Sequence, residues 1–120
     1  MVDFKVGIAL FRDGKPVSQV VWSIGFTDSW VGDYLLVVRG LPYAWDNEDP
    51  LVVCWVDEDI LADMAELMIQ RRFEVCPNVC EWWERFNLAE YDAAAKTGAE
   101  LRELVEQYQA GDEFRYYSDD

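Results

Sequence analysis

The chain has 120 residues, of which 52% are apolar and 15% are aromatic, so it is long and hydrophobic enough to bury one core. It holds 24 Asp and Glu against 10 Lys and Arg, which gives a formal net charge of -14, and it has no histidine. Such a charge repels nucleic acid and anionic membranes and attracts basic protein surfaces. We therefore expect a single domain over residues 1–120 that binds neither nucleic acid nor a membrane directly.

The first quarter of the chain predicts a hairpin of two strands. From Asp3 to Phe11, apolar residues alternate with polar or small ones, which is the period of a half-buried strand. Residues 12–16 are typical of a turn, because the Asp-Gly pair in them tolerates positive φ angles. The alternation resumes from Val20 to Phe26, which predicts the second strand.

Two further strands are predicted after a turn over residues 27–33. Segments 34–38 and 51–56 are apolar at consecutive positions, so we expect both of their faces to be covered. Such coverage is found in central strands, under a second layer, or where a sheet pairs with a second copy of the chain.

The second half of the chain predicts helices. The period changes at Asp57, after which apolar residues follow an i, i+3, i+4 pattern to Met68. We expect a second helix over about 79–86, extending as far as 96 in one reading, and a third that Thr97 caps and Gly111 ends. Residues 112–120 are an acidic and aromatic tail that could be mobile.

Strands first and helices afterwards predict an α+β fold. We expect a four-stranded, mainly antiparallel sheet followed by two or three helices packed on one face.

The residue types present argue against an enzyme. The absence of histidine removes the commonest general base and the usual Ser-His and Cys-His nucleophile pairs. The chain also lacks a glycine-rich phosphate-binding motif. A carboxylate pair of the glycosidase kind is an alternative, but 24 acids place some pair close together by composition alone. We therefore predict no catalytic residues and no cofactor.

The candidate metal ligands are incomplete. Cys54, Cys76 and Cys80 supply three thiols, whereas a structural zinc site takes four Cys or His ligands. The acidic loop 46–57 departs from the calcium-binding EF-hand pattern, because Leu51 stands where that pattern requires glycine. We therefore expect no metal, and we expect the cysteines to pack as small apolar side chains. An odd number of cysteines and the lack of an export signal favour the cytoplasm.

Acidic residues at helical spacing are the main candidates for binding a partner. Asp59, Asp63 and Glu66 share one face of the predicted helix, with Asp57 and Glu58 at its start. Glu100, Glu103 and Glu106 repeat the spacing near the end of the last predicted helix. Carboxylates about 5–6 Å apart give a charge density of the same order as a nucleic-acid backbone. The alternative is a solvated face that keeps the protein soluble.

A loop before the last predicted strand is the second candidate. Tyr43 and Trp45 stand beside Asp46, Glu48 and Asp49, which pairs aromatic residues of the kind enriched at interfaces with a charged rim. In the alternative interpretation, the two aromatic side chains fold back and fill the core.

In composition the chain resembles two groups of inhibitor proteins. One group is phage-encoded nucleic-acid mimics that block defence systems such as CRISPR effectors, and the other is immunity proteins that neutralise toxic nucleases. The resemblance implies a non-enzymatic inhibitor whose acidic helices bind a basic, nucleic-acid-binding effector or nuclease. The alternative from another class is a small structural protein that forms a homodimer through its sheet.

Overall fold

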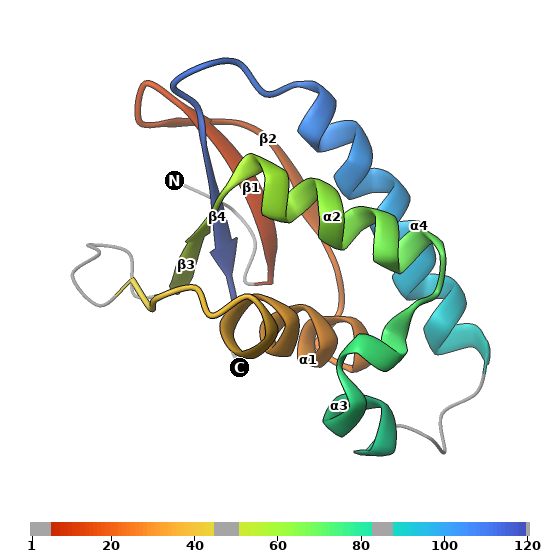
Figure 1. The fold of residues 1–120 in the computed structure, drawn as a ribbon. Coiled ribbons are helices and arrows are strands. Elements are labelled where there is room, and N and C mark those ends of the chain that lie inside the picture. Colours follow the sequence, from red (N-terminus) through yellow and green to blue (C-terminus); the bar gives the residue numbers. More distant parts are fainter. Residues whose placement is uncertain (1–5, 45–50, 83–87, 120) are drawn as a thin grey trace.

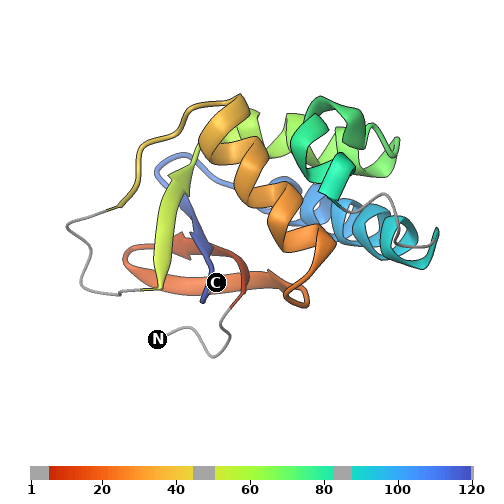
Figure 2. The ribbon, with the colours of Figure 1, turned by 90° about the horizontal axis from the view of Figure 1, so that it is seen from below.

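A four-stranded sheet carries the helices on one of its faces in the computed structural model, which describes residues 6–44, 51–82 and 88–119 (Figures 1 and 2). The strands lie in the order β2-β1-β4-β3, and every neighbouring pair is antiparallel. The predicted α+β fold is thus confirmed. The strands are β1 (Gly7–Arg12), β2 (Lys15–Val21), β3 (Val52–Val56) and β4 (Glu113–Tyr117).

The first two strands form the predicted hairpin, although β2 is displaced. Asp13 and Gly14 both have positive φ angles, 54° and 77°, as a two-residue hairpin turn requires. Because the turn is so short, β2 begins at Lys15 and ends at Val21, whereas the alternation predicted a strand from Val20 to Phe26.

The segment after β2 is helical, which corrects two predictions. The helix α1 (Phe26–Asp33) replaces the turn predicted over 27–33, and a π-helical turn, η1 (Tyr34–Val38), replaces the predicted third strand. Phe26, Trp30 and Tyr34 recur every four residues and are buried, so the helical period outweighs the apolar run. Val37, by contrast, is 69% exposed, so consecutive apolar residues here do not have both faces covered.

The later helices partly follow the prediction. The helix predicted from Asp57 is α2 (Glu58–Ile69), with the expected apolar stripe in the core. Thr97 is buried inside a longer helix and does not cap a third one, because that helix is continuous from residue 88. It ends at Glu106, ahead of Gly111. The remaining elements are η2 (Phe73–Val75, a single 3-10 turn), α3 (Pro77–Trp82) and α4 (Leu88–Glu106).

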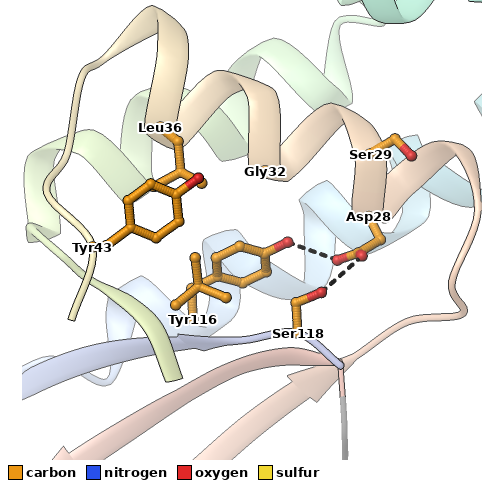
Figure 3. Close-up of a pocket in the computed structure, with 8 residues that line it drawn as sticks. Asp28, Ser29, Gly32, Leu36, Tyr43, Tyr116 and Ser118 are labelled. Atoms are coloured by element: carbon orange, nitrogen blue, oxygen red, sulfur yellow. Dashed lines mark hydrogen bonds between the residues drawn. The ribbon is translucent and has the colours of Figure 1, made fainter. Parts of the chain in front are cut away.

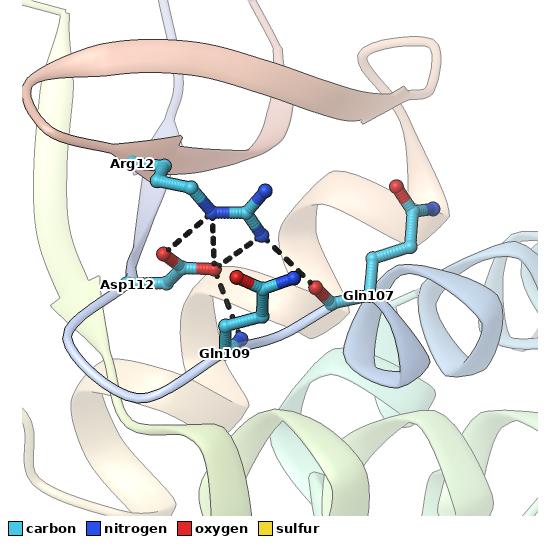
Figure 4. Close-up of polar contacts among 4 residues, drawn as sticks. All are labelled: Arg12, Gln107, Gln109 and Asp112. Carbon is cyan, nitrogen blue, oxygen red and sulfur yellow. Dashed lines mark hydrogen bonds and ion pairs between the residues drawn. The ribbon is translucent and has the colours of Figure 1, made fainter.

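The segment predicted to be a tail, residues 112–120, contains a central strand of the sheet. β4 pairs with β1 on one side and with β3 on the other, and it buries Phe114, Tyr116 and Tyr117. The turn before β4 is held to the hairpin by Arg12, whose Nε and Nη2 donate to Asp112 at 3.0 and 2.8 Å (Figure 4). β4 therefore joins the β1-β2 hairpin to β3 in one sheet.

The main core lies between the sheet and the helices. β3 contributes Cys54 and Val56 to this core, while Val52 packs with Phe11 and Tyr117 in a small cluster on the other face. β3 therefore packs on both faces with residues of the same chain, except at Trp55, which is exposed.

The helices α2 and α4 pack closely and run antiparallel. A Cβ atom on Gly98 of α4 would lie 2.6 Å from the Cβ of Met68 in α2, so only glycine fits at this crossing. Asp92, in the first half of α4, pairs with Arg71 just after α2, and Arg102 pairs with Glu66 further back along α2. The start of α2 and the end of α4 therefore lie at the same end of the pair, as Figure 1 shows.

Candidate partner-binding surface

The acidic residues predicted to bind a partner divide into two groups in the structure. Asp57, Glu58 and Asp59 are exposed at the start of α2, and no described basic side chain lies within ion-pair distance of them. Glu103 and Glu106 are exposed in the last turn of α4, at the same end of the helix pair. We call these five residues the acidic end.

Asp63 and Glu66 form the second group, because each is held by an arginine. Asp63 accepts a hydrogen bond of 3.2 Å from Arg39, and Glu66 pairs with Arg102. Hydrogen bonds from Gln70, and then from Arg102, lower the pKa of Glu66. Exposed ion pairs of this kind contribute little stability, so a stronger partner can displace them.

The helix pair carries half of the net charge of the chain. α2 holds four acids and no base, and α4 holds five acids and two bases, which leaves the pair at -7. The two acids in the last turn of α4 face the negative end of its dipole, although Arg12 of β1 donates to the Gln107 carbonyl just beyond the helix. The two acids themselves disfavour the helix, so the folding of α4 alone does not account for their position.

Of the candidate partner-binding residues in the aromatic loop, Tyr43 is the one that the structure describes. Tyr43 is 51% exposed, which favours the recognition interpretation of this side chain over the core-filling one. It lies beside Val53 near the start of β3, whereas Asp57 directly follows the end of that strand. Four residues of strand put the two sites about 13 Å apart. The other candidates, Trp45, Asp46, Glu48 and Asp49, lie outside the described residues.

A pocket that the sequence did not predict lies between α1 and the end of β4 (Figure 3). It measures about 250 Å³. Its floor holds the carboxylate of Asp28, which is 2% exposed. The lining residues are Asp28, Ser29, Gly32, Leu36, Tyr43, Val53, Tyr116 and Ser118.

The Asp28 carboxylate accepts hydrogen bonds from neutral donors that include Tyr116, Trp22 and Ser118. The Tyr116 hydroxyl and the Trp22 indole donate to Oδ1 at 2.7 and 3.1 Å, and the Ser118 hydroxyl donates to Oδ2 at 3.1 Å. Burial, followed by the charge of Asp28, raises the pKa of the Tyr116 hydroxyl, so this group stays protonated. Asp28 could not be singled out from the sequence, because the sequence predicts a turn over its segment and its partners Tyr116 and Ser118 lie far along the chain.

The cysteines are free thiols without a metal-binding arrangement. Within 6–44, 51–82 and 88–119, no three His, Cys, Asp or Glu side chains are placed to hold an ion. Burial raises the pKa of the Cys54 thiol to about 12 and also raises the pKa of Cys76. These thiols are therefore poor nucleophiles at neutral pH. Among the described helices, none is long and apolar enough to cross a membrane.

The fold and the surface thus define an α+β protein with a strongly acidic helical face and a small pocket beside α1. Comparison of the chain with protein-family models, with curated proteins and with solved structures finds no match.

Proposed function

We propose that the protein is a non-enzymatic inhibitor, acting in the cytoplasm, that docks its acidic end on the nucleic-acid-binding surface of a basic protein. It would act as a nucleic-acid mimic of the phage anti-defence, anti-CRISPR-like kind. The observation that carries the proposal is the acidic end itself, where exposed acids from two antiparallel helices lie at the same end of the pair.

The charges of the acidic end support a role in binding better than a role in folding. The acids at the start of α2 favour the helix dipole, but Glu103 and Glu106 oppose the dipole of α4. Each misplaced acid costs about 0.3–1 kcal/mol. A surface that needs closely spaced negative charge to compete for phosphate-binding Lys and Arg accounts for this loss.

The proposal is tested by affinity capture from the lysate of the native host, at low and high salt and with nuclease added. We expect a basic, nucleic-acid-processing protein at low salt and its loss at high salt, because steering between exposed charges is screened. In the double variant Glu58→Lys with Asp59→Lys, capture should fall at least about tenfold, which corresponds to 1.4 kcal/mol.

The matched control is Glu74→Lys with Glu81→Lys, which reverses the same charge at two exposed acids outside the acidic end. This control should keep most of the capture. An equal loss in both double variants would show that net charge alone governs binding, and it would remove the acidic end from the proposal.

The immunity-protein alternative predicts one cognate nuclease as the captured partner. A mimic should compete with nucleic acid for its target, so adding a DNA duplex to the captured complex distinguishes the two. Release by DNA supports the mimic, and retention in excess DNA supports the immunity protein.

A second candidate function is a homodimer formed through the sheet. It is favoured by Trp55, which is 41% exposed on the edge strand β3, and by Val17 and Val21, which are exposed on the opposite edge strand β2. Sedimentation of the wild type and of Trp55→Lys tests it. A dimer that the variant dissociates supports the assembly role.

A further inference from the structure

A further pocket lies where the segment between β2 and α1 passes beside α4 (Figure 2). It measures about 290 Å³, and among the described residues it shares none of its lining with the pocket around Asp28. Residues 21–27 form one wall, which ends in the first turn of α1. The other wall is one side of α4, where the lining residues recur every three or four positions: Glu90, Ala93, Lys96, Thr97 and Glu100.

Two buried threonines line this pocket, one from each wall. Thr27 of α1 is 6% exposed and Thr97 of α4 is 8% exposed. Within residues 6–44, 51–82 and 88–119, the structure gives neither hydroxyl group a hydrogen bond. Buried hydroxyl groups are normally paired, because an unpaired one loses its hydrogen bonds to water without a replacement. Each threonine can therefore donate a hydrogen bond to an occupant of the pocket and accept one from it.

Charged side chains of alternating sign follow one another along the α4 wall. Their order is Glu90, Lys96 and Glu100, and no described residue forms an ion pair with any of the three. Because a helix rises about 1.5 Å per residue, Lys96 lies about 6 Å from Glu100 and about 9 Å from Glu90 along the axis. A complementary ligand carries one anion, with a cation close to it on one side and a second cation further away on the other.

The surface between these charges is apolar, and the pocket is small. Ala93 lies between Glu90 and Lys96 on α4, and Ile24 and Phe26 belong to the facing wall. A volume of about 290 Å³ is at the lower limit of the range of about 300–1,000 Å³ that is usual for small-molecule sites. Two acids and one base on the α4 wall disfavour a phosphate group. The pocket therefore suits a small molecule with separated charges on an aliphatic stem, and it does not suit a nucleotide.

We propose that this pocket binds a free amino acid with a cationic side chain, such as lysine. Its α-carboxylate pairs with Lys96 and its α-ammonium group with Glu100, while the four-carbon stem carries the side-chain ammonium group toward Glu90. Thr97 donates a hydrogen bond to the carboxylate, and Thr27 accepts one from an ammonium group. The inference goes beyond the proposed function and does not depend on it, since none of these residues belongs to the acidic end.

The test is a titration of the ¹⁵N-labelled protein with free L-lysine, followed by NMR. We expect saturable shifts of the amide signals of Ser23, Gly25 and Thr97, which line the pocket. L-Norleucine has the same stem without the side-chain ammonium group, and cadaverine has both ammonium groups without the carboxylate. N-acetyl-lysine amide lacks both α charges. Each of these three compounds should bind at least about tenfold more weakly than lysine, because each loses a charge-assisted hydrogen bond.

Variants of the α4 wall assign each ligand charge to its partner. Glu90→Gln should weaken lysine binding about tenfold and leave norleucine binding unchanged, since norleucine has no side-chain charge. Lys96→Gln should weaken the binding of both amino acids and should not weaken that of cadaverine, which has no carboxylate. The matched control is Glu81→Gln, which neutralises an exposed acid outside the pocket and should leave the affinity for lysine unchanged.

Thr97→Val tests the buried hydroxyl group on its own, because threonine and valine have similar shapes and helix propensities. The variant should weaken lysine binding several-fold. It should not lower the urea midpoint of the free protein, because the hydroxyl group has no hydrogen bond to lose. A lower urea midpoint with an unchanged affinity for lysine would show a structural role and would overturn the role of Thr97 in binding.

Three results of the titrations would overturn the proposal as a whole. Equal affinities for lysine and cadaverine, with shifts spread over the acids of α2 and α4, would show non-specific attraction of cations. Equal affinities for lysine and N-acetyl-lysine amide would show that the pocket receives a side chain of another protein. The absence of saturable shifts at millimolar lysine would show that the pocket holds water only.

Discussion

The hydroxyl group of Tyr116 in β4 donates a 2.7 Å hydrogen bond to Asp28 in α1, and so joins residues 88 positions apart. It is shorter than the hydrogen bonds that Trp22 and Ser118 donate to the same buried carboxylate. A buried carboxylate is tolerated only where donors replace the water that it loses. Tyr116 of β4 therefore stabilises the buried negative charge of Asp28 in α1.

Tyr116→Phe should destabilise the protein by about 1–3 kcal/mol, because it removes a donor and leaves the buried Asp28 less well satisfied. Urea unfolding, followed by tryptophan fluorescence, measures the change. Tyr108→Phe is the control, since Tyr108 stacks on Phe114 and no hydrogen bond of its hydroxyl appears within the described part of the chain. The control should change the free energy of unfolding by less than about 0.5 kcal/mol. Equal effects of the two variants would contradict this role of the hydroxyl.

Gly98→Ala should destabilise the packing of α2 on α4. The new Cβ would lie 2.6 Å from the Cβ of Met68 and 3.0 Å from the carbonyl oxygen of Ala65, so the helices must separate. Overpacking of this kind costs about 1–3 kcal/mol, against a gain of up to about 1 kcal/mol in helix propensity. We expect a net loss in the free energy of unfolding.

Gly32→Ala is the matched control for this substitution. Gly32 also lies in a helix, α1, but the nearest atom to its Cβ would be the Tyr116 hydroxyl oxygen at an ordinary 3.4 Å. Thermal unfolding of both variants should show a lower melting temperature for Gly98→Ala and an equal or higher one for Gly32→Ala. The reverse order would show that the crossing of the helices is looser than the structure indicates.

The ion pair between Arg12 and Asp112 makes stability depend on pH in the acid range. Hydrogen bonds from Arg12, and then one from the backbone N–H of Gln109, lower the pKa of Asp112 in the folded protein. An acid with a lowered pKa stabilises the fold above its unfolded pKa of about 3.9, and this stabilisation is lost as the pH falls through the folded value. The stability lost in Asp112→Asn should therefore be largest near neutral pH and should shrink below about pH 4.

Urea midpoints of the wild type and of Asp112→Asn, measured from about pH 7 to about pH 3, test this dependence. In an Arg12→Gln background the same substitution should lose most of its pH-dependent effect, because the main cause of the lowered pKa is gone. A difference between wild type and variant that grows as the pH falls would contradict the assignment.

Local sequence patterns predicted the hairpin and α2. They failed for elements whose structure depends on contacts with residues that are distant in the sequence. The hairpin follows from the Asp13-Gly14 turn, which is a property of two adjacent residues. β4 does alternate, with Phe114 and Tyr116 inward, but it is short, and it is held by pairing with β1 and β3, which lie far away in the sequence. A single sequence does not show that pairing.

The candidate site likewise has one feature that the sequence predicts and others that it does not. The spacing of Asp59, Asp63 and Glu66 in the sequence predicts that they lie on one helix, and α2 confirms this. Arg39 and Arg102 hold two of these acids because η1 and α4 pack against α2. No local sequence pattern predicts that packing. For the same reason the sequence does not predict Asp28 as a site residue, because its pocket is formed by segments that are separate in the sequence.

Glu106→Lys separates the folding role of the acidic end from its binding role. The substitution replaces an acid in the last turn of α4 by a base, which the helix dipole favours there, so the free protein should gain about 0.3–1 kcal/mol. If the acidic end docks on a basic partner, capture of that partner should weaken in the same variant, and the remaining capture should depend less steeply on salt because fewer ionic contacts are left. Chemical denaturation and capture at two salt concentrations measure the two effects, and Ala99→Lys, exposed on the same helix, controls for the added lysine. A variant that is more stable and binds as well as the wild type would take the end of α4 out of the interface and leave the start of α2 as the only steering surface.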